Sequence, residues 1–356
     1  MKNATTKGTS AKDRLENLKS TTAQALFERD FKPRQIIIEP WLRTEETAVI
    51  WADTGVGKTM LCLSVALAVA GGGSVADWTT SEPRKVLYID GEMHLQDMKE
   101  RLEILFDSPN ILQREKQKKD ALANLEILAR QDQTIGAPFF DLTSKESQKV
   151  LINRVVRDKV ELLILDNFTT LSEGLDDEND STSFKQVQDF FLQLKRAGIA
   201  TVLVHHSNKQ GKAMRGSTAL AATFEAIIGL EKPRISSPGQ AKFVAKFNKF
   251  RGKGDERLAD RTWSLGDDGW LVSEANPEDP SDDPTLAALK SLQFTSRAQI
   301  AEELGVNKST VTRRIQQWEK LGILKEGEAD ELFSKASELE TEWQRSDLYG
   351  DEDEAF

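Results

Sequence analysis

The chain of 356 residues has one cysteine, three histidines and no long apolar run. A single cysteine, Cys62, excludes an intrachain disulfide framework. No apolar run approaches the ~18 residues that a membrane span needs, and the polar start MKNATTKGTSAKDRLENLKS lacks the apolar region of a secretory signal. Neither a cysteine nor a third histidine lies at ligand spacing from the pair His205 and His206, so a zinc-type site is not expected. These absences predict a cytoplasmic protein without a membrane partner.

Charge is unevenly distributed, and the net charge of -10 conceals opposing blocks. Residues 1–34 hold eight Lys/Arg against four Asp/Glu, residues 241–258 hold six against two, and residues 329–356 hold two against ten. The acidic end therefore supplies most of the net charge. Basic segments remain available to a nucleic-acid partner, although a solvated face is the alternative explanation of such blocks.

From Thr47 onward, short β-rich apolar runs alternate with longer helix-like segments, which is typical of a buried parallel sheet. We expect strands at 47–51, 85–90, 125–130, 160–166 and 199–206. Crossover helices of right-handed βαβ units need longer segments, and these are available at 59–70, 144–157 and 183–198. After Leu230, aromatic and β-branched residues flank Gly-rich turns and predict antiparallel hairpins. The predicted fold class is α/β, a mostly parallel sheet with helices on both faces.

Composition divides the chain into five parts. The acidic, proline-rich stretch 275–284 cannot form a core and is the predicted linker between two domains. A large α/β domain at 25–274 precedes it, and a small helical domain at 285–328 follows it. Residues 1–24 are expected to be a flexible tail. Residues 329–356 are expected to be an acidic tail that solubilises the chain, competes for a basic site or docks a partner.

The run TAVIW leads directly into ADTGVGKT and then an apolar helix, the context in which a Walker A pattern binds phosphate. Backbone N–H groups of such a loop converge on phosphate oxygens at the positive end of a helix dipole. The lysine reaches the β- and γ-phosphates, and the following hydroxyl binds Mg²⁺. The first glycine of GxxxxGK[ST] is Ala52 here, which an extended backbone tolerates. We therefore predict ATP and Mg²⁺ as cofactors, with nucleotide contacts from Thr54, Gly55, Val56, Gly57, Lys58, Thr59 and Met60.

Acidic residues follow two predicted strands, at the edge of the sheet where ligands of α/β proteins bind. Asp166 closes ELLILD, where a Walker B acid holds Mg²⁺; a strand cap is the alternative. Glu92, two residues after VLYID, is the expected general base that polarises water, with Asp90 as its competitor. At the end of the fifth strand, alternation points His205 and His206 to opposite faces, one into the core and one at the sheet edge.

The motifs IIIEPWL, ADTGVGKT, YIDGEM, LLILDN and LVHHSNK, in this order, resemble the RecA-fold AAA-type ATPases similar to the RepA replicative helicase of broad-host-range plasmids, and more distantly the DnaB helicases. The likeness covers about residues 25–265. It implies a homo-oligomeric ring, usually a hexamer, with ATP sites between subunits. The roles it implies are nucleotide and magnesium binding by Lys58 and Thr59, water activation by Glu92, the Walker B acid for Asp166, and a γ-phosphate sensor at His206.

Shared ATP sites need a cation from the neighbouring subunit, because charge develops on the γ-phosphoryl group; an arginine finger is worth ~10³ to 10⁵ in rate. Lys249 and Arg251 form a Lys-x-Arg pair in the late hairpin region. One-residue spacing puts both side chains on one face of a strand, and a similar pair reaches the neighbour's phosphate in the DnaB-like enzymes. Arg215 is a second candidate, and a solvated basic strand edge is the alternative explanation of the pair.

The resemblance also implies two loops, after Asp166 and His206, that line the pore of the ring and contact single-stranded DNA. The second loop, SNKQGKAMRGST, carries Lys209, Lys212 and Arg215 among small polar residues, which suits phosphate tracking. The first, SEGLDDENDST, is acidic and fits direct DNA contact poorly.

Residues 285–328 predict three helices and a turn. AQIAEELG ends at a glycine, and KSTVTRRIQQWEKLG starts with capping-type residues and carries apolar residues at helical spacing. The segment looks like a winged helix-turn-helix with ILKEGE as the wing. Such modules bind duplex DNA or protein. Facing a major groove, its second helix would present Lys308, Thr310, Arg313, Arg314 and Gln317.

The sequence thus predicts a ring-forming, Mg-ATP-dependent replicative DNA helicase of a plasmid, phage or integrative element, which moves single-stranded DNA through its pore. The first alternative is an ATP-switched DNA-binding regulator or transposition/recombination ATPase that assembles on duplex DNA without unwinding it. The second is a RecA-like recombinase. The helical appendage favours the regulator, whereas the Lys-x-Arg pair and the histidine sensor favour the helicase.

Overall fold

The computed structural model describes residues 18–173, 181–207, 222–232, 241–274, 283–320 and 322–349. An amino-terminal unit ends at Gln35 and contains the short helix α2 (Ala23–Phe27), none of whose residues is buried. The unit with the sheet begins at Ile36, later than the boundary predicted at residue 25. None of the helices in the described ranges combines the length and apolar character needed to cross a bilayer.

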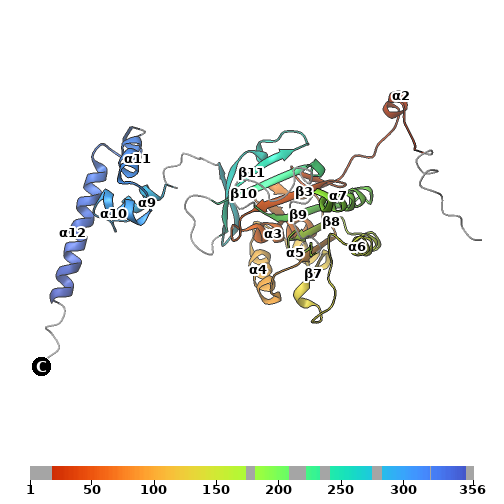
Figure 1. The fold of residues 1–356 in the computed structure, drawn as a ribbon, viewed down its shortest axis with the longest axis horizontal. Coiled ribbons are helices and arrows are strands. Elements are labelled where there is room, and N and C mark those ends of the chain that lie inside the picture. The colour runs from red at the N-terminus through yellow and green to blue at the C-terminus, as the bar shows by residue number, and fades with distance from the viewer. Residues whose placement is uncertain are drawn as a thin grey trace, which may run out of the picture. The chain divides into compact units, whose positions relative to one another are not determined.

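The described residues form a central sheet of nine strands in the order β13-β12-β11-β10-β3-β9-β8-β6-β7 (Figure 1). The parallel part consists of β3 (Thr47–Ala52), β6 (Val86–Asp90), β7 (Leu125–Ala129), β8 (Leu162–Asp166), β9 (Ala200–His206) and β10 (Ala226–Glu231). The five predicted strands are confirmed to within two residues at each end. β10, which pairs with β3, was not expected from the sequence.

The sheet continues beyond β10 through three antiparallel strands, which confirms the predicted hairpins. These are β11 (Lys242–Phe250), β12 (Arg261–Gly266) and β13 (Gly269–Glu274). A bulge interrupts β11, because Ile227 pairs with Lys249 while Ile228 pairs with Phe247. The extra residue, Asn248, accepts a hydrogen bond from Trp51 Nε1 at 3.0 Å, so the bulge is fixed by a contact across the sheet.

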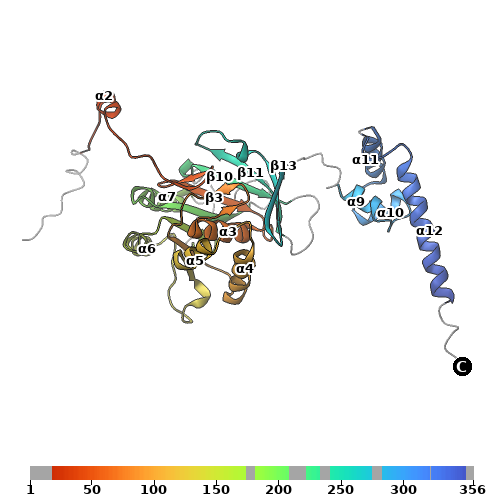
Figure 2. The same cartoon turned by 180° about the vertical axis from the view of Figure 1, so that it is seen from behind.

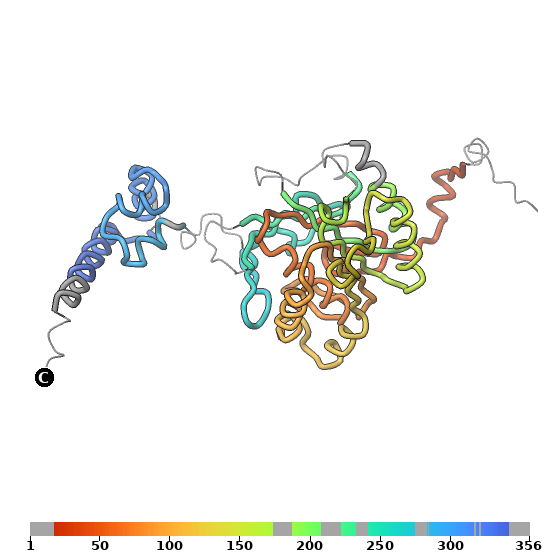
Figure 3. The backbone as a smooth tube through the Cα atoms, turned by 60° about the horizontal axis from the view of Figure 1, so that its bottom comes forward, coloured from red at the N-terminus to blue at the C-terminus, as the bar shows by residue number. Residues whose placement is uncertain are grey.

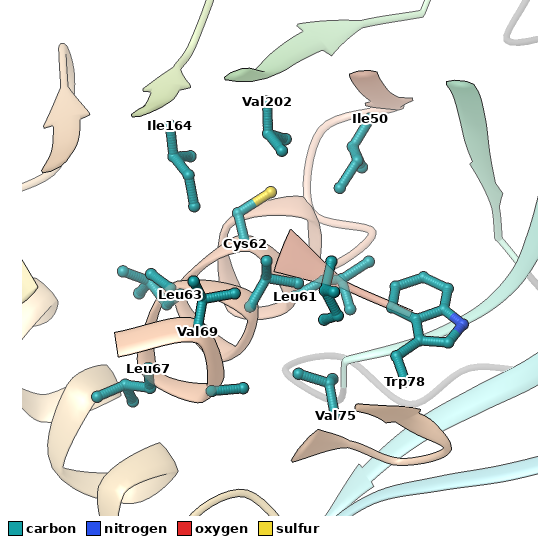
Figure 4. Close-up of a cluster of buried hydrophobic side chains, with 14 of the residues drawn as sticks. Ile50, Leu61, Cys62, Leu63, Leu67, Val69, Val75, Trp78, Ile164 and Val202 are labelled. Carbon is teal, nitrogen blue, oxygen red and sulfur yellow. The ribbon is translucent and has the colours of Figure 1, made fainter. Parts of the chain in front are cut away.

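Alternation along the parallel strands creates two core layers. Ile50, Ile164 and Val202 point toward α3, where they surround Cys62 (Figure 4). This face is covered by α3 (Lys58–Gly71), α4 (Leu95–Asp107) and α5 (Glu115–Asn124) (Figure 2). The opposite face is covered by α6 (Lys145–Arg157) and α7 (Ser181–Arg196), which lie apart from α4 and α5 (Figure 3). The three predicted crossover helices are confirmed.

Small hairpins and an aromatic cluster complete the α3 face. The hairpins pair β1 (Ile36–Ile38) with β2 (Leu42–Arg43) and β4 (Ser74–Val75) with β5 (Trp78–Thr79), and the 3-10 helices are Arg130–Asp132 and Glu256–Leu258. Trp78 contacts Trp263 of β12, with ring centroids 4.5 Å apart. Such aromatic pairs contribute about 0.5–1.5 kcal/mol beyond area burial, so the cluster fastens the hairpins to the antiparallel strands.

The carboxyl-terminal part, taken by itself, contains α9 (Pro284–Lys290), α10 (Arg297–Glu303), α11 (Lys308–Lys320) and α12 (Glu328–Tyr349). Their common core includes Leu286, Ile300, Val311, Ile315 and Trp318. The expected helix, turn and second helix are present as α10 and α11. Of the predicted linker, residues 275–282 lie outside the described residues, and α9 begins at Pro284.

Two expectations for this part were wrong. No strand occurs in the described residues 283–320 and 322–349, so ILKEGE does not form a wing. The reason is the short distance to the next helix: Gly322 and Gly327 both have positive φ, and α12 begins at Glu328. The acidic tail predicted from residue 329 is instead helical through Tyr349, because Ala329 and Phe333 pack into the common core.

Candidate nucleotide-binding site

The phosphate loop connects the carboxyl end of β3 to the amino end of α3. Gly55 and Gly57 have φ values of 78° and 115°, which favour glycine. Gly57 is also tightly packed, since a Cβ there would lie 3.2 Å from Ala241 Cβ. No side chain caps the amino terminus of α3. The N–H groups of its first turn can therefore bind an anion, helped by the helix dipole.

Ala52 replaces the first glycine of the Walker A pattern without distorting the loop. It is the last residue of β3 and pairs with His206 of β9, so its backbone is extended. Its carbonyl oxygen accepts hydrogen bonds from Ser207 N at 3.1 Å and Lys58 Nζ at 2.9 Å. Nothing at this position requires a positive φ.

Lys58 is held over the loop by backbone carbonyl groups. Its Nζ donates to the oxygens of Ala52 and Asp53 at 2.9 and 2.8 Å. Burial lowers the pKa of Lys58, while the negative charge of Asp166 opposes this change. Lys58 Nζ is thus bonded to neutral carbonyl groups in place of water. A phosphate oxygen that enters the loop would form a stronger, charge-assisted hydrogen bond with it.

Asp166 lies at the end of β8, on the face of the sheet that carries α3. It accepts a hydrogen bond from Tyr88 Oη at 2.6 Å. Burial raises the pKa of Asp166, whereas its side-chain hydrogen bonds with Tyr88 and Thr59 lower it. Carboxylate and hydroxyl oxygens are ligands that Mg²⁺ uses together with substrate phosphates. The Asp166 and Thr59 pair therefore fits a nucleotide-bound magnesium ion.

Asp90 and Glu92 have different surroundings although only Gly91 lies between them. Asp90 is buried, and its Oδ2 accepts the N–H groups of Glu92 and Met93 at 3.2 and 2.7 Å. Burial and the nearby charge of Asp166 raise the pKa of Asp90 to about 6. Glu92 is exposed and accepts Asn167 Nδ2 at 2.8 Å. Asp90 thus stabilises the turn that presents Glu92, and Glu92 is the carboxylate that a water molecule can reach.

The two histidines at the end of β9 point to opposite faces, as alternation predicts. His205 is fully buried, its ring 4.6 Å from that of Phe168, and its Nδ1 accepts the N–H of His206 at 2.9 Å. His206 is half-buried and faces the phosphate-loop side as the register partner of Ala52. The next residue, Ser207, donates its hydroxyl to Asp53 in the phosphate loop.

Lys249 and Arg251 do not join this constellation within one chain. Lys249 pairs with Ile227, which is level with Val49, three residues before the end of β3. At ~3.3 Å per residue, the offset from the phosphate loop is about 10 Å along the strands alone. Arg251 follows the last residue of β11 and donates to Ala222 O at 3.0 Å. Both cations therefore lie toward the amino edge of the parallel sheet.

The predicted DNA-contacting residues fall into two groups. Lys209, Lys212 and Arg215 lie outside the described residues, as does most of SEGLDDENDST. The second group lies on α11.

On α11, Lys308 and Arg313 are exposed and Thr310 is half-buried. Arg314 points inward, since its Nη1 donates to Thr285 Oγ1 at 2.6 Å and to Asp283 at 3.2 Å. It fastens α11 to the start of α9 and does not extend a groove-facing surface. The side chain of Gln317 is outside the described set.

Several polar residues of this region were not expected from the sequence. Asn167 directly follows the predicted Walker B acid, and Asp53 and Ser207 flank motif positions, so adjacency was the available signal. Lys195 and Glu225, which form a 2.7 Å ion pair, gave no such signal.

A strand, glycine loop and helix at the centre of this mostly parallel sheet define a P-loop nucleotide-binding fold. Residues 11–212, more than half of the 356, match the family described as AAA domain. The chain belongs to that family.

Solved structures with a similar fold include the flagellar accessory protein FlaH from Methanocaldococcus jannaschii, with 14% identity, a TM-score of 0.44, and coverage of 65% of this chain and 91% of that one. The KaiC-like protein PH0186 from Pyrococcus horikoshii OT3 has 14% identity, a TM-score of 0.45, and coverage of 67% and 93%. The RadB recombinase has 14% identity, a TM-score of 0.43, and coverage of 65% and 92%. No curated protein sequence matched this chain. Similarity at this level carries no functional inference.

Proposed function

We propose that this chain is a Mg-ATP-dependent replicative DNA helicase of a plasmid, phage or integrative element, acting in the cytoplasm as a homo-oligomeric ring, usually a hexamer. Adjacent copies share each ATP, and hydrolysis moves single-stranded DNA through the pore. The supporting observation is the distribution of charged groups over the sheet. Phosphate-binding and water-activating candidates converge at one edge, whereas Lys249 and Arg251 lie toward the other. A second copy is needed to combine them.

The proposed chemistry assigns one task to each side chain. Mg-ATP supplies the phosphoryl group and a metal that screens its charge. Lys58 binds the β- and γ-phosphates, and Thr59 with Asp166 holds the metal. Glu92 takes a proton from the attacking water. His206, beside Ala52, responds to the γ-phosphate.

The phosphate contacts of this scheme extend around the loop. Backbone and side-chain groups at Thr54, Gly55, Val56, Gly57 and Met60 complete the nucleotide site. The neighbouring copy provides Arg251 and Lys249 to the transferring phosphoryl group, with Arg215 as the other candidate.

DNA would be contacted at two places. Lys209, Lys212 and Arg215 would track phosphates of a single strand, which requires positive charge without base reading. The carboxyl-terminal helices would bind duplex DNA or a protein through the exposed Lys308 and Arg313 of α11.

An ATP-switched regulator that assembles on duplex DNA without unwinding it is the second candidate. The helix-turn-helix arrangement of α10 and α11 favours it, because the exposed cations of α11 would suit a major groove.

A forked-duplex assay separates the two candidates. Single-strand-stimulated ATP hydrolysis together with strand displacement supports the helicase, with Lys58→Ala as the inactive control. Hydrolysis without displacement, accompanied by oligomers that form only on duplex DNA, supports the regulator. A chain that stays monomeric with a non-hydrolysed ATP analogue, Mg²⁺ and oligo-dT contradicts the ring.

A further inference from the structure

Arg130 bridges the two strands that flank β6. It directly follows β7, whose last residue, Ala129, is level with Asp90 at the end of β6. On the other side of β6, Asp166 at the end of β8 is also level with Asp90. Arg130 Nη2 donates to Thr170 O, four residues past Asp166, at 2.8 Å. The guanidinium group therefore connects the end of β7 to the segment that follows β8.

Two further contacts fix the guanidinium group of Arg130. Its Nη1 forms an ion pair with Glu173, and its Cζ lies over the Phe139 ring, 4.9 Å from the centroid. Phe139 in turn packs against the core layer that α6 and α7 cover. A planar, forked cation can bind two oxygens and an aromatic face at once, whereas an ammonium group cannot. Because its charge is already paired, Arg130 gives the site a rigid support for Thr170 rather than an additional charge.

Thr170 continues this connection to the candidate general base. Its N–H donates to Asn167 Oδ1 at 3.2 Å, and Asn167 Nδ2 donates to Glu92 Oε2 at 2.8 Å. A side-chain amide has one oxygen and one NH2 group, so the bond from Thr170 to the oxygen turns the NH2 group toward Glu92. Asn167 is buried, which restricts its other orientations. The orientation of the Glu92 carboxylate therefore depends on the position of Thr170.

The residue before Glu92, Gly91, also packs directly on Thr170. A Cβ at Gly91 would lie 2.9 Å from Thr170 Cβ, which is too close for any side chain at this position. The Gly91 N–H donates to Asp166 O at 2.8 Å, so the turn before Glu92 is bonded to β8 as well. A displacement of Thr170 would thus move Glu92 through both its backbone and its side chain.

We propose that Arg130 is a positioning residue that, through Thr170, holds the Glu92 carboxylate where it can take a proton from water. Asn167 is the intermediate that contacts the carboxylate itself. This inference deepens the proposed function and rests on it. Proton transfer requires hydrogen-bond distance between the base and the water. A displaced Glu92 therefore lowers kcat, while the phosphate loop keeps its affinity for nucleotide.

The test compares two arginines of similar exposure. The side chains of Arg130 and of Arg154 in α6 are 27% and 29% exposed, and each forms an ion pair. The partner of Arg154 is Glu126, near the amino end of β7 and away from the site. Arg130→Met should lower the kcat of ATP hydrolysis about 3- to 10-fold, as expected for one lost hydrogen bond. Arg154→Met should keep the wild-type kcat, and both variants should keep the wild-type affinity for a fluorescent ATP analogue.

A double variant identifies the route by which Arg130 acts. In a chain that already carries Asn167→Ala, Arg130→Met should lower kcat no further, because the contact with Glu92 is already lost. A general loss of structure would instead multiply with the loss in Asn167→Ala. Arg130→Lys should recover part of kcat, because its ammonium group still binds one of the two oxygens that Arg130 contacts.

The outcomes separate this inference from the function on which it rests. A wild-type chain that does not hydrolyse ATP contradicts both. Hydrolysis without strand displacement contradicts the helicase, and the Arg130 variants still decide the inference. Equal kcat values for Arg130→Met and Arg154→Met, or losses that multiply in the double variant, overturn the inference alone. Should Arg130→Met lose its cooperative thermal unfolding, Arg130→Lys carries the test, and a loss of kcat that multiplies with that of Asn167→Ala overturns the inference.

Discussion

The two edges of the parallel sheet have opposite charge arrangements. Among the described residues of the carboxyl edge, four carboxylates, Asp53, Asp90, Glu92 and Asp166, lie near one lysine, Lys58. At the amino edge three cations adjoin one carboxylate, and these are Lys195, Lys249, Arg251 and Glu225. The carboxyl edge is therefore suited to a nucleotide with its metal ion, and the amino edge is suited to an additional anion.

This difference explains why a single copy is an incomplete catalyst in our proposal. A carboxylate-rich site can hold the metal and activate water, but it cannot by itself neutralise the charge that develops on a phosphoryl group. The cations that could do so face away from it. Joining the two edges of different copies gives each nucleotide both kinds of group.

Removing the amino-edge cation should have the largest effect. Arg251→Ala should lower ATP turnover by about 10³-fold or more, the range of an arginine finger, while nucleotide affinity stays within a few fold. Turnover and the affinity for a fluorescent ATP analogue are measured separately. A loss of affinity as large as the loss of turnover would place Arg251 in its own chain's nucleotide site and break the comparison between edges.

A mixture of two inactive variants tests whether Arg251 acts on the nucleotide of a neighbouring copy. Lys58→Ala should be inactive because it lacks the lysine of the phosphate loop. A mixture of Lys58→Ala and Arg251→Ala chains should regain part of the activity, since some interfaces then combine an intact phosphate loop with an intact Arg251. The absence of any recovery, with mixed oligomers verified by a tag on one variant, argues against action in trans.

Within the carboxyl edge, Glu92 and Asn167 should differ in degree. Glu92→Gln should lower kcat by about 10²- to 10⁴-fold, as expected for a general base. Asn167→Ala removes the 2.8 Å contact that orients Glu92 and the 3.2 Å bond that Asn167 Oδ1 accepts from Thr170 N. Hydrogen bonds to charged groups contribute about 1.5–3 kcal/mol. Its kcat should therefore fall about 10- to 100-fold, from ~1.36 kcal/mol per power of ten, with KM almost unchanged.

The conservative variant Asn167→Gln provides the control. Partial recovery of kcat supports a positioning role, whereas equal losses for Asn167→Ala and Glu92→Gln would mean that Asn167 contacts the reacting groups itself.

Short apolar, β-rich runs made most of the sheet predictable, but β10 shows where local pattern is insufficient. Its sequence AIIGLE is interrupted by Gly229, a residue that is disfavoured inside strands. A Cβ at Gly229 would lie 2.7 Å from Asn248 Oδ1 and 2.8 Å from the Trp51 ring. The glycine is required by the contact between Trp51 and the β11 bulge, which no local pattern contains.

The missing wing has a similar cause. ILKEGE follows the second helix of the pair, where a hairpin is common, yet the structure begins α12 there. The deciding contacts are those of Ala329 and Phe333 with the core of the other three helices. A segment rich in acids looked like a tail because its few apolar residues are spaced for a helix face rather than clustered.

Whether a contact of the candidate site could be predicted depended on how far apart its residues lie in the sequence. The phosphate loop is one continuous segment, and Asp166 and His206 end consecutive strands, so spacing alone indicated them. Glu92 and Asn167 are 75 residues apart, and Lys195 and Glu225 are 30 apart. These pairs arise from neighbouring strands and a helix end, and only the strand order brings them together.

Removing the positive charges of the second predicted DNA-contacting loop should have a moderate effect on single-strand binding. Replacing Lys209, Lys212 and Arg215 with glutamine or methionine should flatten the dependence of single-strand affinity on salt, because each lost phosphate contact reduces the slope by about 0.7 for single strands. Affinity for oligo-dT is measured between low and physiological salt. An unchanged slope removes these residues from the DNA path, while replacement of Lys308 and Arg313 serves as the comparison for the helical domain.

The smallest expected effect is on stability at the carboxyl edge. The folded-state pKa of Asp90, about 6, lies above the ~3.9 of an unfolded aspartate. Its protonated form is therefore favoured by folding. That contribution is complete below pH ~3.9 and is lost as the pH rises through about 6, so ionised Asp90 destabilises the fold at higher pH.

Asp90→Asn should remove this pH dependence while its amide oxygen still accepts the N–H of Met93. Relative to wild type, the variant should gain about 1 kcal/mol in free energy of unfolding between pH 5 and pH 8, from ~1.36 kcal/mol per pKa unit. The measurement is urea unfolding in EDTA, with the exposed Asp107→Asn as control. Equal shifts in both variants would mean that the crowding of carboxylates at this edge has no energetic cost. The two edges would then differ only in where their charged groups lie, and the carboxyl edge would carry no electrostatic strain.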